Sequence, residues 1–206
     1  MTAIISLISS WALGVIDKTG YVGIFVLSML ESAAIPIPSE VVVPFSGFLA
    51  SSGRFGFWAV VFAATLANLA GSIVLFLIGR SGGRWILERY GKYVFIHQKD
   101  LDLGDRWFSK YGSAAVFFGR MLPVVRTFIS LPAGIAQMSF KKFTAFTFLG
   151  ALPWNFMLAL IGLKLGDNWE VLHPYFQKLN YAIVGVIAVF IILYIRKHYK
   201  MNYKTH

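Results

Sequence analysis

The sequence contains no cysteine, and few of its residues are charged. Of its 206 residues, 14% are charged and nine are acidic, whereas an ordinary soluble domain has about 25% charged residues. The missing cysteines exclude disulfides, thiolate nucleophiles and cysteine-ligated metals. The low charge accompanies 57% hydrophobic residues and a mean hydropathy of +0.68, which excludes a disordered chain and a soluble enzyme with a polar surface. The composition therefore indicates an integral membrane protein.

Basic residues outnumber acidic ones and lie between the apolar segments. The chain has 19 Lys and Arg residues and a formal net charge of +10. In a soluble protein this excess would suggest nucleic acid, but charges that flank apolar stretches set membrane topology and contact anionic headgroups. We therefore expect membrane lipids as partners and no nucleic acid. No cofactor is predicted, and the sequence leaves open a homo-oligomer.

Two uncharged stretches are each long enough to cross a bilayer, which takes roughly 20 apolar residues. They are Phe57–Gly79 and Phe143–Leu163. A third membrane helix is predicted over residues 179–195, which extend the shorter apolar run Tyr181–Ile195. Residues 1–19 are predicted to form an N-terminal interfacial helix.

Two further apolar segments, residues 20–54 and 111–140, carry charges and prolines in their middle. Proline removes an amide donor and clashes with the preceding turn. Broken backbone at membrane depth persists only where protein or a water-filled cavity satisfies it. We therefore interpret both segments as re-entrant helical hairpins, although each proline could produce only a kink. The prolines are Pro36, Pro38 and Pro44 in the first segment and Pro123 and Pro132 in the second.

The basic residues also predict an orientation. By the positive-inside rule, the basic tail 196–206, the lysine pair 141–142 and the amphipathic region 80–110 are cytoplasmic. The segment 111–140 then enters from the cytoplasm, and the segment 20–54 enters from outside. The predicted fold is one all-α polytopic membrane domain over residues 1–206. It is an inverted repeat of a re-entrant helical hairpin plus a transmembrane helix, with an additional C-terminal transmembrane helix, as in many secondary transporters.

A faint internal repeat agrees with this fold. At an offset of 87 residues, Gly47 aligns with Gly134, and Asn68 aligns with Asn155. The glycines would permit close approach of the hairpins, or serve ordinary helix packing. The asparagines lie within the spans, where interhelical hydrogen bonds are expected. The six tryptophans, among them Trp154, are expected mostly at the membrane interfaces.

Four ionisable residues lie inside the hairpins: Glu31 and Glu40 in the first, Arg120 and Arg126 in the second. A charge at membrane depth costs at least about 2.5–3.5 kcal/mol, so these opposite charges should meet. One interpretation is a pair of buried salt bridges, although desolvation largely cancels their attraction. The other is a polar cavity in which the arginines bind an anion through their planar donors and the glutamates take up protons.

The hairpin tips provide further candidate residues. Ser39 follows the first pair of prolines, where it can cap a new half-helix, and Thr127 follows Arg126 between the prolines of the second hairpin. Half-helix N-termini favour anions, so the predicted phosphate-binding residues are Arg120, Arg126, Thr127 and Ser39. The sequence has no P-loop, nucleophile elbow or metal-ligand spacing, and no enzymatic activity is predicted.

The residues of both hairpins resemble the motifs of the DedA family. The run from Glu31 to Glu40 resembles its first hairpin. The run from Phe118 to Thr127, continuing to Pro132-Ala133-Gly134 and Met138, resembles its second. The resemblance covers about residues 20–163. The second motif is the more specific, because it combines two arginines around a proline with a following Ala-Gly pair.

The resemblance implies a bacterial inner-membrane protein related to eukaryotic VTT-domain lipid scramblases. It implies movement of undecaprenyl phosphate, the carrier lipid of cell-wall synthesis, back to the cytoplasmic leaflet, with activity linked to the proton motive force. By motif position, Glu31, Arg120 and Arg126 would be the essential charges, and Glu40 the second acidic position. We therefore expect a proton-coupled transporter of this lipid.

The same charges fit other functions. They would serve a proton-coupled transporter of a small solute or ion, or a general phospholipid scramblase. They would also suit a non-transporting membrane assembly factor, in which the charges would be purely structural. A lateral opening toward lipid distinguishes a lipid carrier from an occluded solute chamber.

Overall fold

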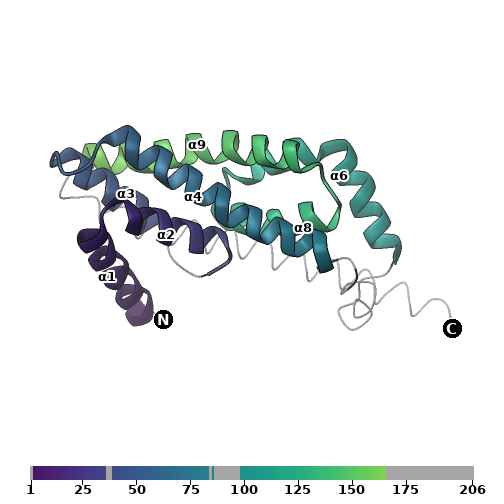
Figure 1. The fold of residues 1–206 in the computed structure, drawn as a ribbon, viewed down its shortest axis with the longest axis horizontal. Coiled ribbons are helices and arrows are strands. Elements are labelled where there is room, and N and C mark those ends of the chain that lie inside the picture. Colours follow the sequence, from purple (N-terminus) through teal and green to yellow (C-terminus); the bar gives the residue numbers. More distant parts are fainter. Residues whose placement is uncertain (1, 36–38, 84, 86–97, 166–206) are drawn as a thin grey trace.

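The computed structural model describes residues 2–35, 39–83, 85 and 98–165, which form an elongated helical bundle (Figure 1). The secondary-structure elements among these residues are all helices, without strands, which confirms the predicted all-α class. The predicted helix 179–195 and the basic tail 196–206 lie outside the described residues. In chain order the elements are α1 (Thr2–Thr19), α2 (Tyr21–Ser32), α3 (Ser39–Ser51), α4 (Phe57–Ile78), the π-helical turn η1 (Gly79–Gly83), α6 (Gln98–Gly119), α7 (Pro123–Phe128), α8 (Ser130–Ile135) and α9 (Phe140–Leu165).

Two long apolar helices occupy the predicted membrane spans. The segment formed by α4 and η1, and helix α9, are each long and apolar enough to cross a membrane. The two helices run in opposite directions (Figure 1). At one end the ring centroids of Phe57 and Phe156 lie 5.5 Å apart, and at the other Phe76 stacks on Phe143 at 4.2 Å. The C-terminal end of α4 therefore lies beside the N-terminal end of α9.

Other helices pack on the two spans in a reciprocal pattern. In the first half of the chain, α2 packs against α4, and α3 packs against α9. In the second half, α6 packs against α9, and α8 packs against α4 and η1. Each span therefore contacts helices from both halves of the chain. Helix α1 lies against α2 and α3.

Glycines permit the closest of these contacts. A Cβ atom at Gly47 of α3 would overlap the carbonyl oxygen of Ala159 in α9, and one at Gly134 of α8 would overlap the carbonyl oxygen of Phe76 in α4. Any larger residue would push the helices apart, because both neighbours are backbone atoms. The two glycines related by the offset of 87 residues thus occupy matching positions in the reciprocal packing.

The helix breaks differ in part from those predicted at prolines. After α6 ends at Gly119, α7 begins with Pro123, a first helical position where the missing amide hydrogen removes no bond. Pro132 lies in the first turn of α8, and the interruption at Ile129 precedes it, as expected from a proline that cannot bond to the carbonyl of Phe128 and clashes with it. Pro44 lies inside α3, where it removes one backbone hydrogen bond without ending the helix. Of the prolines in the two described segments, only Pro44 therefore lies in a helix that continues through it.

Helix α6 also differs from the predicted boundary at residue 111. It begins at Gln98 and runs unbroken through that position. The stretch contains no proline, and its internal glycines, Gly104 and Gly112, each cost about 1 kcal/mol in a helix without ending it. The described end of the predicted amphipathic region and the first part of the predicted second hairpin are consequently one continuous helix.

A layer of polar side chains divides the apolar core. One apolar cluster includes Leu27, Val43 and Leu158, and the other includes Phe76 and Phe143. Between them, the middle of both spans contributes buried polar residues, and this polar layer is where the predicted charges gather. Its members are Thr65, Asn68 and Ser72 on α4, and Thr147 and Asn155 on α9.

Candidate functional site

Two of the predicted charges form a buried ion pair beside the polar layer. Glu31 lies in the last turn of α2, and Arg126 lies in α7. The Nη2 atom of Arg126 donates to Oε1 of Glu31 at 2.6 Å, and the two side chains are 6% and 8% exposed. This contact connects the first half of the chain to the second. Removing either member would leave the other as an uncompensated buried charge.

The carboxylate of Glu31 accepts further hydrogen bonds from its surroundings. Thr127 Oγ1 donates to Oε1 at 3.4 Å, and Asn68 Nδ2 donates to Oε2 at 3.3 Å. Both distances exceed the usual range for such bonds, so the contact with Arg126 is the strongest of the three. The carboxylate is therefore oriented by α4 and α7 together.

The polar layer connects the ion pair to both spans. Asn155 Nδ2 on α9 donates to Asn68 Oδ1 on α4 at 2.8 Å, the interhelical hydrogen bond expected for these asparagines. Asn68 Nδ2 in turn donates to Ser32 Oγ at 2.7 Å and to the carbonyl oxygen of Ser28 at 3.1 Å. A continuous hydrogen-bonded path thus runs from α9 through α4 to α2.

Arg120 is the second buried arginine of the site. It follows α6, is 2% exposed, and donates from Nη2 to Ser130 Oγ at 2.6 Å. Gly150 of α9 leaves room for it, since a Cβ there would lie 2.9 Å from Cβ of Arg120. Among the described side chains, no carboxylate lies within ion-pair distance of Arg120, and its Nε has no hydrogen-bond acceptor. A buried guanidinium in this state is a donor group suited to an anion.

Both arginines lie near aromatic rings of α9. The guanidinium carbon of Arg120 is 6.0 Å from the ring centroid of Phe143, and that of Arg126 is 5.5 Å from Trp154. Such contacts favour a cation over an aromatic face. Trp154 is 8% exposed and lies in the middle of α9, so it is not one of the tryptophans at a segment end. The rings are eleven residues apart, about three helical turns, a spacing that could have indicated a shared face.

The predicted charges converge only in part within the described structure. Glu31 and Arg126 touch, and Arg120 lies within electrostatic range of both. Thr127 contacts Glu31. Ser39 begins α3 and Glu40 follows it, but the positions of both side chains lie outside the description, as do Pro36 and Pro38. Sequence reasoning missed Ser130, which had no charge or motif to distinguish it.

Comparison of the sequence with known proteins identifies a family. The VTT domain matches residues 37–164. The uncharacterized membrane protein YkoX of Bacillus subtilis is 39% identical over 201 residues, which cover 96% of this chain and 89% of that protein. Undecaprenyl phosphate transporter A of the same organism is 36% identical, with 94% and 96% covered. Protein DedA of Escherichia coli is 28% identical, with 76% and 70% covered.

No solved structure matches the chain. The domain match and the identities with relatives along almost their whole length nevertheless agree with the motifs around Glu31, Arg120 and Arg126. They also agree with the two apolar spans. The chain therefore belongs to the VTT-domain, or DedA, family of membrane proteins.

Proposed function

We propose that this protein is a transporter that moves undecaprenyl phosphate across the bacterial cytoplasmic membrane. The relative named undecaprenyl phosphate transporter A supports a membrane transporter with a lipid substrate. The observation that carries the proposal is the environment of the Arg120 side chain. It is buried without a carboxylate partner among the described side chains, and a lipid phosphate would supply both the missing negative charge and oxygen acceptors for its donors.

The proposal includes two re-entrant hairpins in an inverted repeat. Helix α2 has 12 residues, about 18 Å at 1.5 Å per residue, whereas the hydrocarbon core is about 30 Å thick. Helix α3, with 13 residues, is equally too short to span. The reciprocal packing of α3 on α9 and of α8 on α4 supports the repeat. So does the hydrogen bond between Asn68 and Asn155, the two asparagines that the offset relates.

In the proposed mechanism the phosphate passes the arginines while the isoprenoid chain stays in lipid. Arg120 receives the phosphate first, because Arg126 is held by Glu31. Uptake of a proton neutralises Glu31 and releases Arg126 to the phosphate. Thr127 and Ser39 provide hydroxyl donors at the helix ends, and Glu40 is the second proton-carrying group. Loss of the proton restores the ion pair and expels the anion.

The proposed orientation places the C-terminus and the 80–110 region in the cytoplasm. Support comes from the exposed basic residues at one end of the bundle. Arg80 follows α4, and Lys141 and Lys142 lie in the first turn of α9. Because the two spans are antiparallel, all three lie at the same membrane surface, where the positive-inside rule expects the cytoplasm.

Transbilayer movement of undecaprenyl phosphate in proteoliposomes tests the proposal. Wild type is compared with Arg120→Gln, with pH gradients of both signs and a fluorescent glycerophospholipid as control lipid. Arg106→Gln, which removes an exposed arginine from α6, is the matched control. We expect rapid movement of the polyprenyl phosphate, lost only in Arg120→Gln. Equal movement of both lipids would indicate a scramblase, and movement of neither would favour a solute transporter or an assembly factor.

A further inference from the structure

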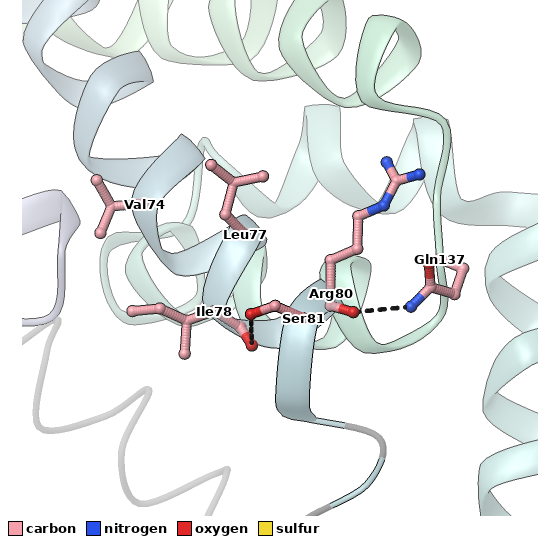
Figure 2. A pocket seen from close by; sticks show the side chains of 6 residues that line it. All are labelled: Val74, Leu77, Ile78, Arg80, Ser81 and Gln137. Carbon is pink, nitrogen blue, oxygen red and sulfur yellow. Dashed lines mark hydrogen bonds between the residues drawn. The ribbon is translucent and has the colours of Figure 1, made fainter.

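A hollow lies at the C-terminal end of α4, and the buried charges are not among its lining residues. Its volume is about 610 Å³. One side is apolar and belongs to the last two turns of α4, and the other side is polar and includes a cation. Figure 2 shows the side chains that line it: Val74, Leu77, Ile78, Arg80, Ser81 and Gln137.

The apolar side of this hollow faces outward on a predicted span. Val74, Leu77 and Ile78 are 40%, 48% and 54% exposed. In a membrane, side chains in these positions contact hydrocarbon chains and not water. The hollow is thus continuous with the region that a lipid chain would occupy.

The backbone that carries Arg80 is held firmly. Gln137 Nε2 donates to the carbonyl oxygen of Arg80 at 3.1 Å (Figure 2). A Cβ at Gly134 would lie 2.9 Å from the amide nitrogen of Arg80, and one at Gly79 would lie 2.5 Å from the carbonyl oxygen of Leu131. Helix α8 therefore packs directly on the π-helical turn, a type of helix irregularity that is frequent at functional sites.

The guanidinium of Arg80 is available to a ligand. The side chain is exposed, and within the described part of the chain it has no acidic or hydrogen-bonding side-chain partner. Arg80 and Leu77 extend to the same side of the helix (Figure 2). A cation thus lies next to an apolar wall at the membrane surface.

A smaller hollow of about 220 Å³ adds positive charge on the other side of Gln137. Lys142 lines it together with three hydroxyl groups, and among the described residues that line either hollow none is acidic. The electrostatic preference of this surface is therefore for an anion. The hydroxyl groups belong to Ser109, Ser113 and Ser139.

We propose that the larger hollow is a binding site for an anionic glycerophospholipid. The phosphate of the headgroup lies at Arg80, and one acyl chain follows Leu77, Val74 and Ile78. Charge complementarity selects the headgroup, and the exposed apolar wall selects a membrane lipid over a soluble phosphate. The site is separate from Arg120 and Arg126, and it does not depend on the transport proposed above.

Quenching of a probe beside the hollow tests this site. Because the sequence has no cysteine, Gly82→Cys gives one labelling position, and a Cβ there meets no atom within 4 Å. The full-length protein carries a bimane label and is placed in vesicles containing phosphatidylglycerol or phosphatidylcholine with brominated chains. We expect phosphatidylglycerol to be preferred about fivefold, which corresponds to about 1 kcal/mol for one basic residue at an anionic surface.

Two variants and a second probe position test whether the lipid preference is specific to this hollow. Arg80→Gln should abolish the preference, and Lys164→Gln, which removes an exposed charge at the far end of α9, should retain it. An equal response to both lipids in the wild type would overturn the proposal, as would a preference that survives Arg80→Gln. The same preference at a probe on Ser52→Cys, at the opposite end of the bundle, would also overturn it, because the attraction would then be general.

Discussion

Glu31 and Arg126, which are 95 residues apart in the chain, share a 2.6 Å hydrogen-bonded ion pair inside a membrane protein. Both side chains are buried, and the contact lies where α2 meets α7. Its partners come from the two halves of the proposed repeat. The pair therefore links the two halves while it occupies one of the two arginines of the site.

Removal of one member of this pair should destabilise the protein strongly. We expect Arg126→Met to lower the free energy of unfolding by about 3–5 kcal/mol, because Glu31 is then left buried and uncompensated. The double variant Glu31→Gln with Arg126→Met should recover much of this loss, since no member of the pair is then left as an uncompensated charge. Thermal unfolding of purified protein in detergent measures both. Equal loss in the single and double variants would contradict an energetically important pair.

Arg120→Gln should leave stability nearly unchanged or raise it. The guanidinium has no carboxylate partner among the described residues, so its removal relieves a desolvation cost without exposing an opposite charge. Glutamine retains a donor for Ser130. The same unfolding assay measures the effect. A loss as large as that of Arg126→Met would show that Arg120 is a structural residue, and the phosphate-binding role would then lose its basis.

Binding of a lipid phosphate should weaken in the same Arg120→Gln variant. A hydrogen bond to a charged group contributes about 1.5–3 kcal/mol, so we expect about a tenfold to hundredfold weaker affinity for undecaprenyl phosphate. Quenching of intrinsic tryptophan fluorescence by a brominated polyprenyl phosphate measures it. Arg106→Gln should bind as the wild type does, and comparable weakening there would point to a general charge effect.

The packing glycines should tolerate substitution far less than an open one. At Gly134 an added Cβ would overlap the backbone of α4, so Gly134→Ala should destabilise by about 1–3 kcal/mol, as overpacking does. Gly14 in α1 has no atom within 4 Å of such a Cβ. Gly14→Ala should therefore be neutral or stabilising by up to about 1 kcal/mol. Unfolding midpoints that change equally in both variants would refute the close approach of α8 and α4.

The absence of cysteine permits a direct test of topology. Ser52 and Ser81 are exposed residues near opposite ends of α4. In intact cells, a membrane-impermeant maleimide should label Ser52→Cys, which we place outside, and should label Ser81→Cys only after the cells are opened. The reverse pattern would invert the proposed orientation. Labelling of both positions from outside would exclude α4 as a membrane span.

Local properties of the sequence determined the class, the spans and the candidate charges. Hydropathy is a sum over neighbouring residues, so the stretch from Phe57 to Gly79 was identifiable as a span without any knowledge of its partners. The expectation that Glu31 would meet an arginine followed from the cost of an isolated charge in hydrocarbon. The motif around Arg120 and Arg126 indicated the family that the comparisons show.

Only the tertiary structure decided which groups meet. Whether Arg126 pairs with Glu31 while Arg120 contacts Ser130 depends on the rotation and depth of each helix. These in turn depend on how closely backbones approach at Gly47 and Gly134. The burial of Trp154 beneath a guanidinium follows from the same packing. Such contacts join residues far apart in the chain, and hydropathy, which averages over one segment, carries no information about the neighbour that the segment will face.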